Sequence, residues 1–84
     1  MYWDVVSVRP VGHLRLAVRF ADGLSGDVVF KESHLIGVFE ALKDPDLFAR
    51  VRCDDGFVQW PGDLDLAPDA MYDSIKAGGC WVLD

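Results

Sequence analysis

The side chains best suited to nucleophilic or acid–base chemistry are two histidines, His13 and His34, and two cysteines, Cys53 and Cys80. Nucleophilic catalysis needs a nucleophile, a base and a group that orients the base, all converging in space. Cys53 or Ser33 could be paired with His34, but no spacing motif supports either pair. The cysteines also lack the Cys-x-x-Cys spacing of redox and zinc sites, so we expect small, buried, reduced thiols. We predict no catalytic residue and a protein that is not an enzyme.

A group of aspartates in the second half of the chain suggests a site for a hard cation, because Ca²⁺ prefers several oxygen ligands. The group consists of Asp54, Asp55, Asp63, Asp65 and Asp69. Its spacing does not match the EF-hand loop, which places acidic or amide residues at alternate positions, then a glycine and a distant glutamate. Turn formation and charge near a helix N-terminus explain most of these residues. We therefore expect neither a metal ion nor a cofactor.

Arginines form a second candidate group. Arg15 and Arg19 share one face of an alternating segment, and Arg50 and Arg52 extend this patch, together with Arg9, if two hairpins lie side by side. Such a patch could bind RNA or an acidic segment of a partner, whereas a solvated sheet face with carboxylate partners is the simpler reading. An RNA-binding sheet also needs exposed aromatic residues among the basic ones, and the pattern shows none on this face.

Aromatic residues are the third group, with Trp3, Trp60, Tyr72 and Trp81 as candidates for contact with a partner. Tryptophan and tyrosine commonly anchor protein interfaces, but both are also large residues that pack in cores. The sequence leaves both roles open.

The composition sets limits on these possibilities. The chain has 84 residues, of which 51% are hydrophobic, and its formal net charge is −6. A domain of this size removes only roughly 60–65% of its unfolded surface from water, so some of the apolar side chains should need a second copy or a partner to cover them. The net negative charge repels phosphate backbones, so we do not expect the isolated domain to bind nucleic acid.

The N-terminus Met1-Tyr2-Trp3-Asp4 has neither the basic region nor the apolar segment of a signal peptide. No window approaches the ~18 uninterrupted apolar residues that span a bilayer. We expect a cytoplasmic protein that does not enter membranes, with residues 1–84 forming a single domain.

The secondary structure that must position these residues begins with a meander. Valine-rich residues 4–10 predict a first strand, and strict alternation over residues 13–20 predicts a half-buried second strand. Ala21-Asp22-Gly23 supplies a hairpin turn, after which residues 25–30 return as the third strand.

Helical spacing of apolar residues over 35–42 then predicts one short helix lying across the meander, ended by Asp44-Pro45. A second hairpin follows over residues 51–60, and a C-terminal helix starts at Pro68 and stops before Gly78-Gly79. Residues 80–83 are a final strand or a tail against the core. The predicted fold is α+β: a three-stranded antiparallel meander, a helix, a second short β-hairpin and a C-terminal helix.

Three segments in this order carry a family resemblance. They are Phe20-Ala21-Asp22-Gly23, then Leu42-Lys43-Asp44-Pro45-Asp46-Leu47-Phe48, then Trp60-Pro61-Gly62-Asp63-Leu64-Asp65-Leu66-Ala67-Pro68-Asp69-Ala70-Met71-Tyr72. With them the chain resembles the small bacterial family called domain of unknown function 2442, over roughly residues 4–73. The resemblance implies a small α+β protein. Some members are fused to a helix-turn-helix domain, and many are encoded beside another small protein, in an arrangement similar to a toxin–antitoxin pair.

From these observations we expect a non-enzymatic interaction module that resembles an antitoxin-like or accessory partner of a small neighbouring protein. It would occlude that partner by burying apolar surface framed by acidic residues, and it would form a homo-oligomer. The alternative is a nucleic-acid-associated regulator that uses the arginine patch.

Overall fold

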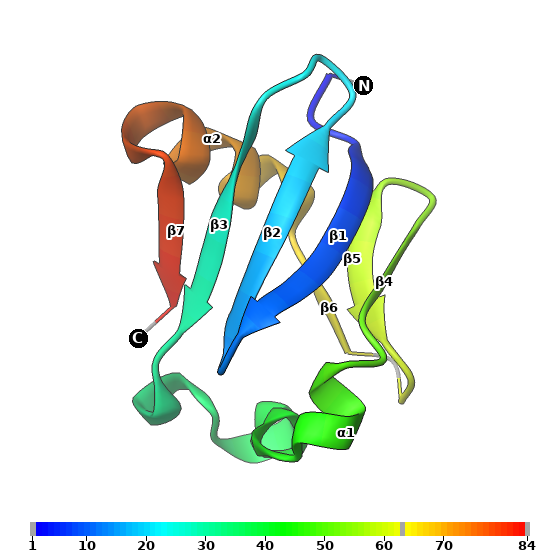
Figure 1. Ribbon diagram of the computed structural model, residues 1–84, viewed down its shortest axis with the longest axis vertical. Coiled ribbons are helices and arrows are strands. Elements are labelled where there is room, and N and C mark those ends of the chain that lie inside the picture. Colours follow the sequence, from blue (N-terminus) through cyan, green and yellow to red (C-terminus); the bar gives the residue numbers. More distant parts are fainter. Residues whose placement is uncertain (1, 63, 84) are drawn as a thin grey trace.

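Two β-sheets pack against a shared apolar core in the computed structural model, which describes residues 2–62 and 64–83 (Figure 1). The first sheet has four strands in the order β1-β2-β3-β7, and the second has three in the order β4-β5-β6. The strands are β1 (Val5–Gly12), β2 (Arg15–Phe20), β3 (Ser25–Phe30), β4 (Arg52–Asp54), β5 (Phe57–Trp60), β6 (Leu64–Leu66) and β7 (Cys80–Leu83). The predicted α+β fold is confirmed.

Strands β1, β2 and β3 form the expected antiparallel meander. The alternation in β2 buries Leu16, Val18 and Phe20 on the inner face and leaves Arg15 and Arg19 exposed on the outer face. This is the arrangement that a period of two dictates when one side of a sheet faces a core and the other faces water.

The C-terminal part adds a strand to this sheet. Helix α2 (Pro68–Gly78) crosses behind the sheet, and β7 then pairs with β3 in parallel, so residues 80–83 form a strand rather than a tail (Figure 1). The helix lies very close to β3 because Gly26 has no side chain. A Cβ atom at Gly26 would lie 2.5 Å from Cγ2 of Ile75 and 2.6 Å from the carbonyl oxygen of Gly79.

The helix predicted across the meander is instead divided and displaced. Residues Glu32–His34 and Gly37–Lys43 form two 3₁₀ helices, followed by the short α1 (Pro45–Phe48), at the lower end of the molecule in Figure 1. Gly37 has a φ of +59°, a left-handed conformation that interrupts any continuous helix through this region. The helix that packs against the meander is α2 instead.

The second hairpin, β4 and β5, is present as predicted, and β6 pairs with β5 to extend it to a sheet. The inner face of this sheet contributes Val58, Trp60, Leu64 and Leu66 to the core. Trp60 is 1% exposed, and its Nε1–H donates a hydrogen bond of 3.0 Å to the carbonyl oxygen of Phe48. No helix within residues 2–62 and 64–83 is both long and apolar enough to traverse a bilayer.

Candidate functional site

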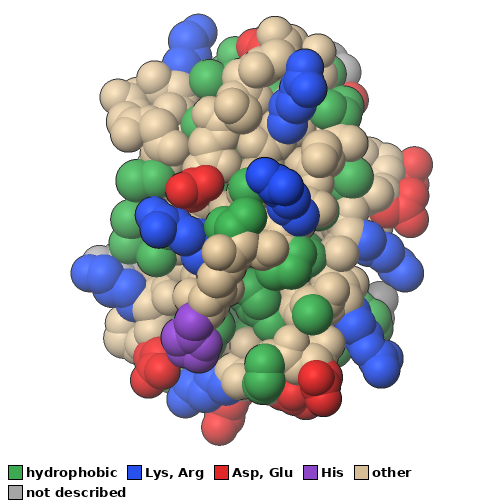
Figure 2. Space-filling view, viewed as in Figure 1, with side chains coloured by type: hydrophobic (Ala, Val, Ile, Leu, Met, Phe, Trp, Pro, Cys, Tyr) green, Lys and Arg blue, Asp and Glu red, His purple; other side chains and the backbone are tan. Residues whose placement is uncertain are grey.

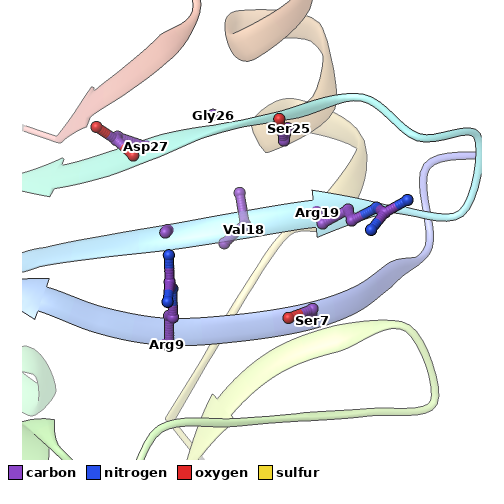
Figure 3. A pocket seen from close by; sticks show the side chains of 8 residues that line it. Ser7, Arg9, Val18, Arg19, Ser25, Gly26 and Asp27 are labelled. Carbon is purple, nitrogen blue, oxygen red and sulfur yellow. The ribbon is translucent and has the colours of Figure 1, made fainter.

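The outer face of the four-stranded sheet carries a shallow polar depression of about 420 Å³ (Figure 3). Its lining residues are Ser7, Arg9, Ala17, Val18, Arg19, Ser25, Gly26 and Asp27. Strand pairing puts small or polar residues in the middle of this face, since Ala17 lies between Arg9 and Asp27 in register. In Figure 2, which looks onto this face, basic side chains stand out over the strands and most acidic ones lie toward the margins.

We call this surface the arginine face, defined by Arg9, Arg15 and Arg19. Nε of Arg15 lies 3.4 Å from Oδ2 of Asp27, and both side chains are about half exposed, so solvent weakens this ion pair. Arg9 and Arg19 have no carboxylate within ion-pair distance among the described residues. Two arginines in this depression are therefore available for an anionic ligand.

The predicted patch of Arg15, Arg19, Arg50 and Arg52 is not a single surface. Arg52 is on the outer face of β4 in the second sheet, and Arg50 is in the turn between α1 and β4. Both sheets turn their inner faces to the shared core, so their outer faces point away from each other. The residue that joins Arg15 and Arg19 is Arg9, because β1 is the neighbour of β2.

Two of the four aromatic candidates are in the core. Trp60 and Tyr72 are buried, so neither ring presents a surface for a partner to contact. Trp3 and Trp81 are half-buried against the core and keep part of their surface in water. The most exposed aromatic residues are Tyr2 and Phe57, at 53% and 42%.

Tyr2 and Phe57 belong to one end of the molecule, which we call the acidic end. It consists of the aromatic and apolar residues Tyr2, Trp3, Val6 and Phe57 and the carboxylates Asp4, Asp22, Asp54 and Asp55. The ring of Tyr2 contacts those of Trp3 and Tyr72, with centroid distances of 4.8 and 4.9 Å. From the sequence, Asp54 and Asp55 were only metal or turn candidates, and Asp22 was only part of a hairpin turn. Burial alone distinguishes Tyr2 from the other aromatic residues.

Backbone hydrogen bonds hold the acidic end together. The N–H of Val5 donates to the carbonyl oxygen of Gly56 at 3.0 Å, and the N–H of Ala21 donates to that of Asp4 at 2.8 Å. The N-terminal residues are thereby tied both to the β4–β5 turn, where Asp55 follows Asp54 at the end of β4, and to the β2–β3 turn, which carries Asp22. Aspartates from three segments distant in the sequence are thus brought to the same end of the molecule as Tyr2.

The histidines and cysteines do not assemble into a reactive site. Nε2 of His13 lies 3.8 Å from Oε1 of Glu32 at the surface, whereas His34 packs between the rings of Phe30 and Phe39. Both cysteines are free thiols; Cys53 is half-buried, and Cys80 is exposed rather than buried as expected.

The carboxylates are likewise dispersed. Asp54, Asp55, Asp65 and Asp69 are exposed, and Asp63 lies outside the described residues. Within residues 2–62 and 64–83, no group of three or more His, Cys, Asp or Glu side chains is close enough to hold a metal ion.

A second, more apolar cavity of about 250 Å³ lies between the β1–β2 turn and α1. Its lining residues are Pro10, Gly12, His13, Leu14, Leu42, Lys43, Pro45, Phe48 and Ala49. It is smaller than the roughly 300–1,000 Å³ typical of small-molecule sites.

The fold and surfaces define a small α+β domain of two packed sheets, with an arginine face and an acidic end. The chain belongs to the family described as protein of unknown function DUF2442, whose model matches residues 5–77. The family resemblance inferred from the sequence is therefore confirmed. No curated protein and no solved structure matches the chain.

Proposed function

We propose that the protein is a non-enzymatic interaction module, and that its acidic end binds a basic segment of a small protein partner. In this role it resembles an antitoxin-like or accessory protein that occludes its partner. The observation that carries the proposal is the position of Tyr2, whose ring is half exposed beside Trp3 and Tyr72. Tyrosine and tryptophan are enriched among the residues that anchor protein interfaces.

The chemistry of this end favours a basic ligand. Lysine and arginine side chains interact with the faces of tyrosine and tryptophan rings, and the surrounding carboxylates attract the same positive charges. Asp4 adds to this field beside Gly56, where a Cβ atom would lie 2.7 Å from its Oδ1. Apolar contact through Val6 and Phe57 would exclude water from the interface and strengthen the charged contacts.

The test is co-expression with the protein encoded beside it, followed by co-purification. A variant with Tyr2→Ser and Phe57→Ser should lose the partner, and wild type should release it as salt concentration rises. Ile36→Ser is the matched control, because Ile36 is also an exposed apolar residue, 69% accessible, but lies between the 3₁₀ helices at the other end. Equal retention of the partner by both variants would contradict the proposal.

A second function is favoured by the depression on the arginine face, where no carboxylate of the described residues forms an ion pair with Arg9 or Arg19. This face suits a polyanion such as single-stranded nucleic acid, which binds positively charged grooves. Two features oppose this function: the net charge of −6, and the absence of aromatic residues among those lining the depression. We therefore place it second.

A further inference from the structure

Strand β7 lies at the margin of the four-stranded sheet, with β3 on one side only (Figure 1). The N–H groups of Asp27 and Lys31 donate to the carbonyl oxygens of Gly79 and Leu83, at 3.3 and 2.8 Å. Backbone groups of successive strand residues point alternately to the two sides. The N–H and C=O groups of Cys80 and Val82 therefore point away from β3, toward an edge where the described residues provide no strand.

This edge lacks the features that normally prevent strands from pairing between molecules. Edge strands are commonly protected by charged residues, proline or bulges. The segment Cys80-Trp81-Val82-Leu83 contains no charge and no proline, and Val82 is 43% exposed. Among the described edge strands, β1 carries Arg9, β4 carries Arg52 and Asp54, and β6 carries Asp65, which leaves β7 as the uncharged one.

We propose that two copies of the protein form a symmetric dimer through antiparallel pairing of their β7 strands, with Trp81 on the two-fold axis. In this register Cys80 lies opposite Val82 of the second copy, and the pair exchanges both of its N–H···O=C hydrogen bonds. These bonds use the N–H and C=O groups that point away from β3. The two four-stranded sheets become one continuous sheet, with both arginine faces on the same side.

The side chains suit this register. Trp81 is paired with buried Val28 and therefore lies on the inner face, only partly buried, where it would pack against Trp81 of the second copy. Facing aromatic residues stabilise antiparallel pairs, and strand neighbours on one face have Cβ atoms about 4.5–5.5 Å apart. Cys80 and Val82 face the outer side, where no charged residue of β7 opposes the approach of a second acidic chain.

A second copy is favoured over a foreign strand because the segment is complementary to itself. The two-fold axis passes between the two Trp81 residues and pairs Cys80 of each copy with Val82 of the other, so one surface satisfies both sides. Two-fold dimers are the commonest solution for small domains, and 84 residues with 51% hydrophobic content leave apolar surface to cover. The dimer is independent of partner binding at the acidic end, which involves other residues.

Disulfide trapping tests the register. In a Cys53→Ala background, Val82→Cys should form an intermolecular disulfide with the native Cys80 under mild oxidation, because antiparallel hydrogen-bonded neighbours have Cα atoms about 5.5 Å apart. Without this substitution, two Cys80 residues would lie two positions apart along the strands, beyond the ~7 Å limit for a disulfide. Val11→Cys is the matched control, since Val11 is 45% exposed in β1, and it should not cross-link.

Sedimentation at micromolar concentration gives the second measurement. Wild type should sediment at twice the 9.3 kDa chain mass. Val82→Pro removes an N–H that does not bond to β3, so it should keep the fold, checked by thermal melting, and raise the dimer dissociation constant about tenfold or more. Three results would each overturn the proposal: a monomeric wild type, a Val82→Cys cross-link that persists when Cys80 is replaced by serine, or a folded Val82→Pro variant that dimerises normally.

Discussion

The hydroxyl of Tyr72 in α2 donates a hydrogen bond of 2.5 Å to Oδ2 of Asp22 in the β2–β3 turn. The ring of Phe20 meets the Tyr72 ring edge-on, at a centroid distance of 5.1 Å. These contacts join the first and third of the segments that carry the family resemblance, and the bond from Trp60 to Phe48 joins the second and third. The segments that make the family recognisable thus serve to hold the fold together.

The first prediction concerns the pH dependence of the Tyr72–Asp22 hydrogen bond. This bond raises the pKa of Tyr72 to about 12, and together with the N–H of Leu24 it lowers the pKa of Asp22. Because the pKa of unfolded tyrosine is about 10, stability contributed by Tyr72 is present below pH 10 and is lost as the pH rises toward 12. Stability contributed by Asp22 is present above its unfolded pKa of about 3.9 and is lost as the pH falls through the lowered value.

Tyr72→Phe should therefore be less stable than wild type at pH 7, and the difference should shrink in strong base and strong acid. Urea denaturation across this pH range measures it, with Tyr2→Phe as the control for loss of an exposed hydroxyl. A difference that stays constant over the whole range would contradict the role of this bond.

The second prediction concerns the contact between α2 and β3. Gly26→Ala should destabilise the protein by about 1–3 kcal/mol, because the new methyl group would overlap Ile75 and the backbone of Gly79. Gly12→Ala is the control, since a Cβ atom there has nothing within 4 Å. Thermal or chemical denaturation compares the two, and equal stability of both variants would show that α2 can shift away from β3 without cost.

The third prediction concerns Trp60. Replacement by phenylalanine removes the indole donor from the buried Phe48 carbonyl, which keeps the N–H of Val51 at 3.3 Å, so the lost hydrogen bond costs about 0.5–1.5 kcal/mol beyond any loss of packing. Trp3→Phe replaces a half-buried ring at the surface with a smaller one and should lower the free energy of unfolding by less. If chemical denaturation shows equal losses for the two variants, the hydrogen bond contributes little to stability.

The fourth prediction concerns nucleic acid. With a net charge of −6, the protein should show no salt-sensitive binding to duplex DNA or single-stranded RNA near physiological salt. Fluorescence anisotropy with labelled oligonucleotides measures this. Micromolar binding that disappears with Arg15→Glu and Arg19→Glu together, but not with Arg52→Glu on the other sheet, would instead establish the arginine face as the functional site.

Local patterns were sufficient to predict much of the fold. The alternation in β2, the glycine turns of both hairpins and Pro68 at the start of α2 each depend on residues close together in the chain. The division of residues 32–43 into two 3₁₀ helices was not predicted, since apolar spacing over a few residues does not distinguish a 3₁₀ helix from an α-helix. The third strand of the second sheet, β6, was also missed; β4 is equally short but was indicated by the Asp-Gly turn that follows it.

The sequence by itself determined which side of β2 faces the core, because a period of two assigns alternate residues to opposite faces. It could not determine which strands become neighbours. Tertiary structure alone decided that Arg9, rather than Arg52, shares the outer sheet face with Arg19, and that β7 returns parallel to β3 at an edge of the sheet. It also decided that Trp60 is buried while Tyr2 is exposed, because burial depends on contacts between segments distant in the chain, which spacing along the sequence does not record.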